Sequence, residues 1–92
     1  MGADMNWDDL RFFHVASVCK NFSEAAANLN VRHTTLSRRI KRLESKFRVR
    51  LFVRTNQGMV LTKNGSELAT VTLGMYDLFQ KLYSGKLFSL PD

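Results

Sequence analysis

The apolar residues of this chain change their spacing close to Arg50, and that change limits the folds available to it. Before Arg50 they recur every three or four residues, as on one face of an α-helix. Directly after it, residues 51–54 and 59–61 form two short, largely apolar runs on either side of the polar segment 55–58, which is typical of a β-hairpin. Beyond Thr62 the helical spacing returns. The sequence therefore predicts several helices, one small hairpin and a further helix.

Two helices are predicted before Arg32. The first begins after Asn6, whose side chain can cap it and which is followed by two aspartates that complement the helix dipole, and it ends near Lys20 and Asn21. Ser23 is the expected cap of a second, short helix. The alanines of this second helix permit close approach of a neighbouring helix.

The third predicted helix, from about Thr34 to Lys46, has two chemically different faces at 100° per residue. One narrow sector is expected to face the core, and it holds the apolar residues Leu36, Ile40, Leu43 and Phe47. The exposed sector is polar and cationic, and it holds Thr34, Ser37, Arg38 and Lys41, flanked by Arg39 and Arg42. Such a face is suited to binding an anion.

The fourth predicted helix runs from a cap at Thr62 to about Tyr83, a length of roughly 33 Å at ~1.5 Å per residue. It has two apolar faces, and one small domain can cover only one of them. One face is a heptad-like stripe of Leu68, Val71, Met75, Leu78 and Leu82. We interpret this stripe as a dimerisation surface; the alternative is that it belongs to the internal core.

Positive charge is concentrated in the middle of the chain. Residues 32–54 contain nine basic residues and one acidic residue, a net charge of +8, whereas residues 1–31 carry −2 and residues 55–92 carry 0. Solvated surfaces normally mix both signs, because like charges repel one another. This segment therefore predicts a polyanionic partner.

Length and composition exclude several classes of protein. Ninety-two residues, 45% of them apolar, allow one packed domain and exclude a large enzyme. The single cysteine, Cys19, cannot form an internal disulfide, and no cysteine or histidine spacing suggests zinc, so we expect no metal, no cofactor and a cytoplasmic location. No apolar run approaches the ~20 residues that cross a bilayer. No spacing suggests a catalytic triad or phosphate loop, and we expect no enzymatic activity.

Short motifs follow one another in a specific order from Leu10 to about Leu82. They are Leu10-Arg11-Phe12-Phe13, Asn21-Phe22-Ser23-Glu24-Ala25-Ala26, Leu29-Asn30-Val31, Leu36-Ser37-Arg38-Arg39-Ile40, Leu43-Glu44, Arg50-Leu51-Phe52-Val53-Arg54 and Leu61-Thr62-Lys63-Asn64-Gly65. In this order the chain resembles the N-terminal DNA-binding region of LysR-type transcriptional regulators. The resemblance implies a mainly α fold: a winged helix-turn-helix of three helices and a short two-stranded β-wing, followed by a long dimerisation linker helix.

The resemblance also implies how the chain is divided. Residues 1–61 would form the DNA-binding domain, with 1–5 disordered, residues 62–84 the linker and dimerisation helix, and residues 85–92 a C-terminal tail. A much larger effector-binding domain, which would take a small-molecule effector, is expected after the linker helix. Because the chain lacks it, we expect an isolated DNA-binding fragment or an unusual short member, acting as a homodimer or, in a full-length form, a higher oligomer.

The function that the resemblance implies is sequence-specific binding of double-stranded DNA. A dimer would place the third helices in major grooves and the wings on the backbone or the minor groove. The expected DNA-binding residues are Arg32, His33, Thr34, Ser37, Arg38, Lys41, Arg42, Arg54, Gln57 and Thr62. Arg38 can pair with a guanine or clamp a phosphate, and Thr62 is an expected phosphate site, with a hydroxyl and the free N–H groups of the helix start nearby.

Two positions depart from the family's pattern. The family usually enters the third helix with Ser-Gln-Pro or Ser-Gln-Ser, where this chain has Arg32-His33-Thr34. We therefore expect Thr34 to take over the cap and Arg32 to add a phosphate contact, while His33 is either a base or phosphate contact or a plain turn residue. Lys20 replaces a glycine that commonly ends the first helix, so Asn21 is expected in the left-handed conformation.

An alternative function uses the same fold. A winged helix can be a protein-interaction module, and its basic face would then bind an acidic protein partner. In that case affinity for duplex DNA would be no better than non-specific.

Overall fold

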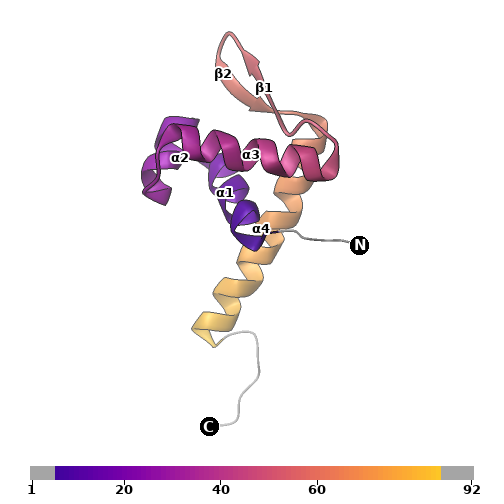
Figure 1. Cartoon of the computed structure of the whole chain (residues 1–92). Helices are drawn as coiled ribbons and strands as arrows, with labels where there is room; N and C mark the ends of the chain where they lie inside the picture. Colours follow the sequence, from indigo (N-terminus) through magenta and orange to yellow (C-terminus); the bar gives the residue numbers. More distant parts are fainter. Residues whose placement is uncertain (1–5, 86–92) are drawn as a thin grey trace.

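The computed structural model describes residues 6–85, in which four helices and one two-stranded antiparallel sheet follow one another (Figure 1). The elements are α1 (Trp7–Val18), α2 (Phe22–Leu29), α3 (His33–Phe47), β1 (Phe52–Thr55), β2 (Gly58–Leu61) and α4 (Lys63–Ser84). The predicted mainly α arrangement of three helices, a small wing and a long last helix is confirmed. The predicted disorder of residues 1–5 and most of the predicted tail, residues 86–92, lie outside the described residues.

The junction of α1 and α2 differs from the prediction. Asn6 caps α1 as expected, its Oδ1 accepting from the Asp8 N–H at 2.9 Å, but α1 ends at Val18. Asn21, not Ser23, caps α2 by accepting from the Glu24 N–H at 2.8 Å, while the Glu24 carboxylate accepts from the backbone of Lys20. Asn21 is extended (φ −156°) in this cap, so the prediction that it is left-handed is wrong. The prediction that Ser23 caps α2 is also wrong, because Asn21 provides the cap.

The hydrophobic core lies where the first three helices meet the base of the hairpin. The rings of Phe13 and Phe22 contact that of Phe52, with centroids 5.6 and 4.9 Å apart. The buried apolar residues are Leu10, Phe12, Phe13, Ala16, Phe22, Ala25, Ala26, Leu36, Ile40, Leu43, Leu51 and Phe52. The prediction for Phe47 is wrong: it is 41% exposed, because α3 ends at this residue and the chain turns away through left-handed Arg48.

The turn between α2 and α3 sets where the third helix begins. Asn30 is left-handed (φ 58°), and Val31 donates its N–H to the carbonyl of Ala26 at 3.0 Å. The N-cap of α3 is Arg32, which makes no side-chain capping hydrogen bond, so the cap expected at Thr34 does not form. Helix α3 therefore starts at His33, one residue earlier than predicted.

The hairpin and α4 are joined closely. β1 and β2 pair from Phe52↔Leu61 to Thr55↔Gly58, with a two-residue turn between them. Thr62 caps α4 as predicted, accepting from the Gly65 N–H at 2.9 Å. Gly65 is buried, and a Cβ there would collide with the backbone carbonyl oxygen of Leu51. The first turn of α4 is thus fixed against the start of the wing.

The long helix α4 crosses α1 and extends past it (Figure 1). At the crossing, the ring of His14 stacks on that of Tyr76 at 4.1 Å, and His14 Nδ1 lies 3.3 Å from the hydroxyl of the buried Thr72. Among the helices of residues 6–85, none combines the length and hydropathy that a membrane span requires.

Candidate nucleic-acid interface

On the outward face of α3, two cations have no ion-pair partner among the described residues 6–85. Arg38 and Lys41 are exposed, and no acidic side chain within residues 6–85 forms an ion pair with either of them. Thr34 is exposed on the first turn of the same helix, and Ser37 is half-buried. The structure therefore places four of the predicted contact residues on one accessible side of one helix.

At the start of α3, Arg32 and His33 are both exposed. His33 is the first residue of the helix and not a turn residue. Its ring lies 5.9 Å from that of Phe22, and its Nδ1 is 3.5 Å from the Ser37 hydroxyl. These two neighbours hold the imidazole at the exposed end of the helix, next to the predicted contact face.

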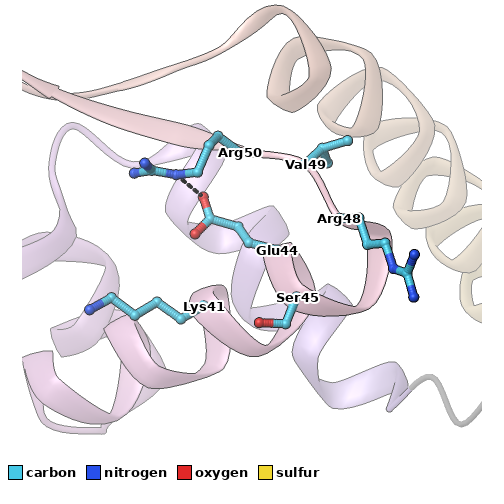
Figure 2. A pocket seen from close by; sticks show the side chains of 6 residues that line it. All are labelled: Lys41, Glu44, Ser45, Arg48, Val49 and Arg50. Carbon is cyan, nitrogen blue, oxygen red and sulfur yellow. Dashed lines mark hydrogen bonds and ion pairs between the residues drawn. The ribbon is translucent and has the colours of Figure 1, made fainter.

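The wing is tied to α3 by a single carboxylate. Glu44 Oε2 accepts from the backbone N–H groups of Leu51 at 2.8 Å and of Phe52 at 3.3 Å, and lies 3.5 Å from Arg50 Nε (Figure 2). Lys41 and Arg50 extend toward the same side of this carboxylate, and Arg48 points away (Figure 2). Glu44 thus fixes the wing relative to the exposed face of α3.

Two open pockets lie along this side of α3. The larger, of about 630 Å³, is lined by Lys41, Glu44, Ser45, Arg48, Val49 and Arg50. The smaller, of about 150 Å³, lies between α3 and the wing, and its polar lining residues are Ser37, Lys41, Glu44, Arg50 and Arg54. The structure therefore brings the β1 residue Arg54 beside the exposed face of α3, while Gln57 is exposed in the hairpin turn.

The hydroxyl of Thr62 is not free to donate to a phosphate. Its hydroxyl donates to the carbonyl oxygen of Arg50 at 2.6 Å and accepts from the Gly65 N–H. Because a hydroxyl has one proton to donate, that proton is already used within the fold. Thr62 acts as the cap of α4 and as its link to the wing.

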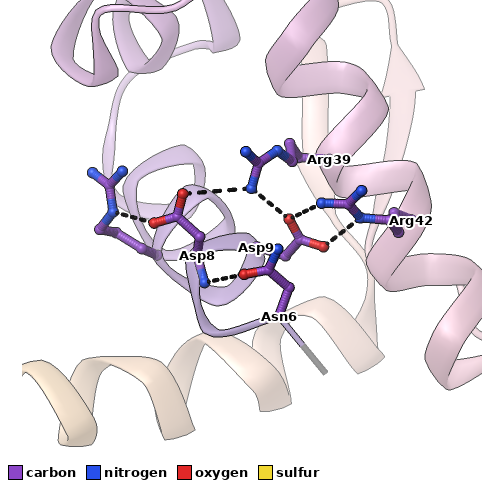
Figure 3. A network of polar contacts seen from close by, with 6 residues as sticks. Asn6, Asp8, Asp9, Arg39 and Arg42 are labelled. Carbon is purple, nitrogen blue, oxygen red and sulfur yellow. Dashed lines mark hydrogen bonds and ion pairs between the residues drawn. The ribbon is translucent and has the colours of Figure 1, made fainter. Parts of the chain in front are cut away.

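The side of α3 that faces α1 is different, because its arginines are bound to a buried carboxylate. Arg42 Nε and Nη2 donate to the two oxygens of Asp9 at 2.7 and 2.9 Å (Figure 3). Arg39 Nη1 donates to Asp9 at 2.9 Å and lies 3.5 Å from Asp8, with its guanidinium 4.6 Å from the ring centroid of Phe12. Two of the cations on α3 thus form part of the α1–α3 contact.

Asp9 is ionised in this setting. Burial by itself raises the pKa of Asp9, but the hydrogen bonds from Arg42 and Arg39 and their positive charges outweigh it, so the pKa lies below its ordinary value. The hydrogen bond to Asp9 likewise raises the pKa of Arg42. The ion pair therefore persists at neutral pH.

From the sequence, Asp9 is expected only to complement the helix dipole, so its pairing with the two arginines was not predicted. A signal was present: Asp9 precedes Phe12, Phe13 and Ala16 by three, four and seven residues, which puts it on the buried stripe of α1. A carboxylate on such a stripe needs a cationic partner.

The predicted dimerisation stripe on α4 is divided by the fold. Leu68 and Met75 are partly buried against the core of their own chain, whereas Val71, Leu78 and Leu82 are 56, 54 and 46% exposed. Trp7 and Phe79 are also exposed beside the stripe, and neither was among its predicted residues. A groove of about 290 Å³ combines both sets and is lined by Trp7, Met75, Leu78, Phe79 and Leu82.

The sequence is similar to those of known transcriptional regulators. The HTH-type transcriptional activator AmpR of Yersinia enterocolitica is 37% identical over 70 residues, which are 76% of this chain and 24% of AmpR. The chain spans about a quarter of the length of the curated relatives it matches first.

Solved structures share the fold. The BenM_DBD/catB site 1 DNA complex superposes with a TM-score of 0.78 at 24% identity, over 87% of this chain and 90% of the BenM chain. A LysR-family transcriptional regulator from Eggerthella lenta has a TM-score of 0.68 at 28% identity, over 73% of this chain and 96% of that one.

The family itself is shown by a sequence match that covers more than half of the chain. Residues 7–66, from the start of α1 to the first turn of α4, match the family described as bacterial regulatory helix-turn-helix protein, LysR family. This chain therefore belongs to the LysR family of bacterial regulatory helix-turn-helix proteins.

Proposed function

We propose that this chain binds double-stranded DNA sequence-specifically, as the DNA-binding part of a transcriptional regulator. The observation that carries the proposal is the exposed face of α3, where Arg38 and Lys41 have no acidic partner among the described residues. A similar fold is bound to DNA in the BenM complex, and the AmpR relative is a transcriptional activator. These likenesses favour DNA over an acidic protein as the partner.

The proposed complex places α3 in the major groove, where the four base pairs present distinct edges. His33, Thr34, Ser37 and Arg38 are proposed to face the bases. Arg38 has the two-pronged donor set that pairs with guanine, and the same fork would also bind a phosphate. Base contacts would give the sequence preference.

Phosphate contacts would surround this face and fix the register of the protein on the duplex. Arg32, Lys41 and Arg42 are proposed to bind phosphates beside the major groove. Arg54 and Gln57 of the wing are proposed to reach the backbone or the minor groove. Thr62 is proposed to mark a phosphate site formed by the backbone N–H groups at the start of α4, because its own hydroxyl is engaged within the fold.

Residues 6–61 are the proposed DNA-binding part, and residues 62–84 the dimerisation part. The exposed apolar residues of α4 support a homodimer, since contiguous apolar surface of this kind marks protein interfaces. Two α3 helices spaced one turn of DNA apart, about 34 Å, would reinforce each other on a two-fold symmetric site. In a protein as long as the relatives, a small-molecule effector would bind outside these 92 residues, and the proposed location is the bacterial cytoplasm.

The direct test is selection of genomic fragments by the purified chain, followed by affinity measurements over a range of salt concentrations. The expected result is a two-fold symmetric site and a slope of log K against log salt near about −5 to −9, from roughly 6–10 phosphates at ~0.9 each. A slope shallower than about −2 contradicts the proposed interface. Preferential capture of an acidic protein, with only non-specific DNA affinity, would support the interaction module instead.

The dimer has its own test. Leu78→Glu places a charge within the exposed apolar groove of α4 and is expected to yield monomers in analytical ultracentrifugation. Gln80→Glu is the matched control, because Gln80 is exposed on the same helix but faces away from Leu78 at 100° per residue. Unchanged dimers in the Leu78 variant would show that the groove is not the interface.

A further inference from the structure

Arg42 is paired with Asp9 through only one edge of its guanidinium. Its Nε and Nη2 donate to the two Asp9 oxygens, while Nη1 has no hydrogen-bond partner within the described range 6–85. The side chain is 48% exposed, whereas Asp9 is 3% exposed. Because a guanidinium has five N–H donors, this side-on geometry leaves an outer edge of N–H groups open to solvent.

Arg39 contacts the same carboxylate but is less exposed than Arg42. Its side chain is 22% exposed and lies over the ring of Phe12, with Nη1 directed to Asp9 and Asp8. Arg39 is therefore part of the packing between α1 and α3. Of the two arginines, Arg42 is the more exposed, at 48% against 22%, so its free donors are the more accessible to a ligand.

The network keeps a net positive charge. It joins the carboxylates of Asp8 and Asp9 to three guanidinium groups, those of Arg11, Arg39 and Arg42. One positive charge thus remains uncompensated, and Arg42 is the member that lies beside the outward face of α3. An anion at its outer edge would complete the charge balance.

The position of Arg42 on α3 points to the backbone of DNA rather than to a base. Arg42 follows Arg38 by four residues, which places it about 40° around the helix from Arg38, on the side toward α1. A helix that lies in the major groove has a phosphate backbone along each of its sides. The outer edge of Arg42 therefore faces the region where one backbone would pass.

We propose that Asp9 is a positioning residue for DNA binding: it holds the Arg42 guanidinium on the flank of α3 so that the outer edge binds a DNA phosphate. The inference rests on the proposed DNA-binding function. A free arginine loses side-chain freedom when it binds, whereas a fixed one has already lost it on folding. A bidentate N–H edge also matches the geometry of phosphate oxygens.

The decisive variant is Asp9→Asn, because charge and positioning predict opposite results. Removing a carboxylate makes the protein more positive, so a simple charge effect would tighten DNA binding and steepen the salt slope. Loss of positioning instead weakens binding about tenfold for each half-site. The salt slope of the dimer then becomes shallower by about 2, because two phosphate contacts are lost.

The measurement is fluorescence anisotropy with the duplex recovered from genomic selection, at several salt concentrations and at a temperature where circular dichroism shows native helix content. Asp77→Asn is the matched control: Asp77 is exposed on α4, and its loss changes the charge equally without touching α3. In an Arg42→Gln background, Asp9→Asn is expected to cause no further loss of affinity. An additive loss there would overturn the positioning role.

Arg42→Lys keeps the proposal testable even where the Asp9 variant does not fold. Lysine retains the charge but has no second N–H edge at a fixed angle to the first, so Arg42→Lys is expected to bind more weakly than the wild type, though by less than Arg42→Gln. Wild-type affinity in Arg42→Lys, or tighter binding by Asp9→Asn, would overturn the positioning role of Asp9 and leave the proposed DNA binding intact. Failure of the wild-type chain to bind any duplex overturns the proposed function itself.

Discussion

Both sides of α3 carry basic residues, but the two sides differ in how these residues are paired with carboxylates. On the side toward α1, Arg39 and Arg42 are bound to the buried carboxylate of Asp9. On the outward side, Arg38 and Lys41 have no acidic partner in the part of the chain that the structure describes. A count of charges along the sequence treats all four alike. The difference shows that a cation's role on a helix depends on which neighbouring element supplies a carboxylate.

A second carboxylate, Glu44, also limits which part of α3 is open, because carboxylates bind α3 to neighbouring elements on both of its sides. Asp9 connects α3 to α1, and Glu44 connects α3 to the start of the wing through the backbone N–H groups of Leu51 and Phe52. Both carboxylates accept several hydrogen bonds and are largely removed from solvent. The strip between them is the part of α3 left open to a ligand.

The largest effect is expected from removing the anchor on the α1 side. Asp9→Ala leaves Arg39 without its principal partner in a partly buried position, at a cost of roughly 1–3 kcal/mol in the free energy of unfolding. Arg38→Ala, on the outward side, should change that free energy by no more than about 0.5 kcal/mol. Urea denaturation at one protein concentration measures both. Equal losses in the two variants would contradict the distinction between the two sides.

Arg38 should matter for DNA binding although it hardly affects stability. Arg38→Ala is expected to weaken binding to the selected DNA site by roughly 1–3 kcal/mol and to relax the preference at one base pair if Arg38 contacts a base. Lys41→Ala is expected to weaken binding to all sequences alike and to make the salt slope shallower by about 1 for each half-site. Affinities for the selected duplex and for a mixed-sequence duplex separate the two roles. An Arg38 variant with wild-type affinity would remove the central contact of the proposal.

Much of the fold follows from local signals in the sequence. Asn6 and Thr62 cap their helices as predicted, and Leu36, Ile40 and Leu43 are buried at helical spacing. The predictions that failed depend on contacts between elements or on competing caps. Asn21 takes the cap in place of Ser23, with Glu24 accepting from Lys20 in the same turn, and Phe47 is exposed because its helix ends there.

The candidate site could be predicted in outline but not in detail. The periodicity of α3 separates its buried face from its polar face. On the polar face Thr34, Arg38 and Lys41 are exposed as expected, and Ser37 is half-buried. The pairing of Asp9 with Arg39 and Arg42 joins residues 30 and 33 positions apart. No periodicity within one helix reveals such a contact, because the packing of α1 on α3 creates it. The engagement of the Thr62 hydroxyl by Arg50 is hidden for the same reason.

A smaller effect is expected on the other side of α1, where His14 contacts α4. Burial lowers the pKa of His14, so the folded state favours the neutral ring. Stability is therefore fully present above the ordinary histidine pKa of about 6.5, and part of it is lost as the pH falls through the lower folded value. Urea midpoints at pH 7.5 and 5.5 should differ more for the wild type than for His14→Gln. An equal fall in both proteins would assign the pH response to other groups.

The smallest effect is expected from an ion pair that lacks burial. Lys81 Nζ and Asp77 Oδ2 lie 3.3 Å apart on α4, but the two side chains are 51 and 62% exposed. Water solvates both groups nearly as well without the pair, so Asp77→Asn should change the free energy of unfolding by no more than about 0.5 kcal/mol. The same urea experiment measures this change beside that of Asp9→Ala. If Asp77→Asn lost as much stability as Asp9→Ala, burial would not explain why the ion pairs of Asp9 contribute more than the exposed pair on α4.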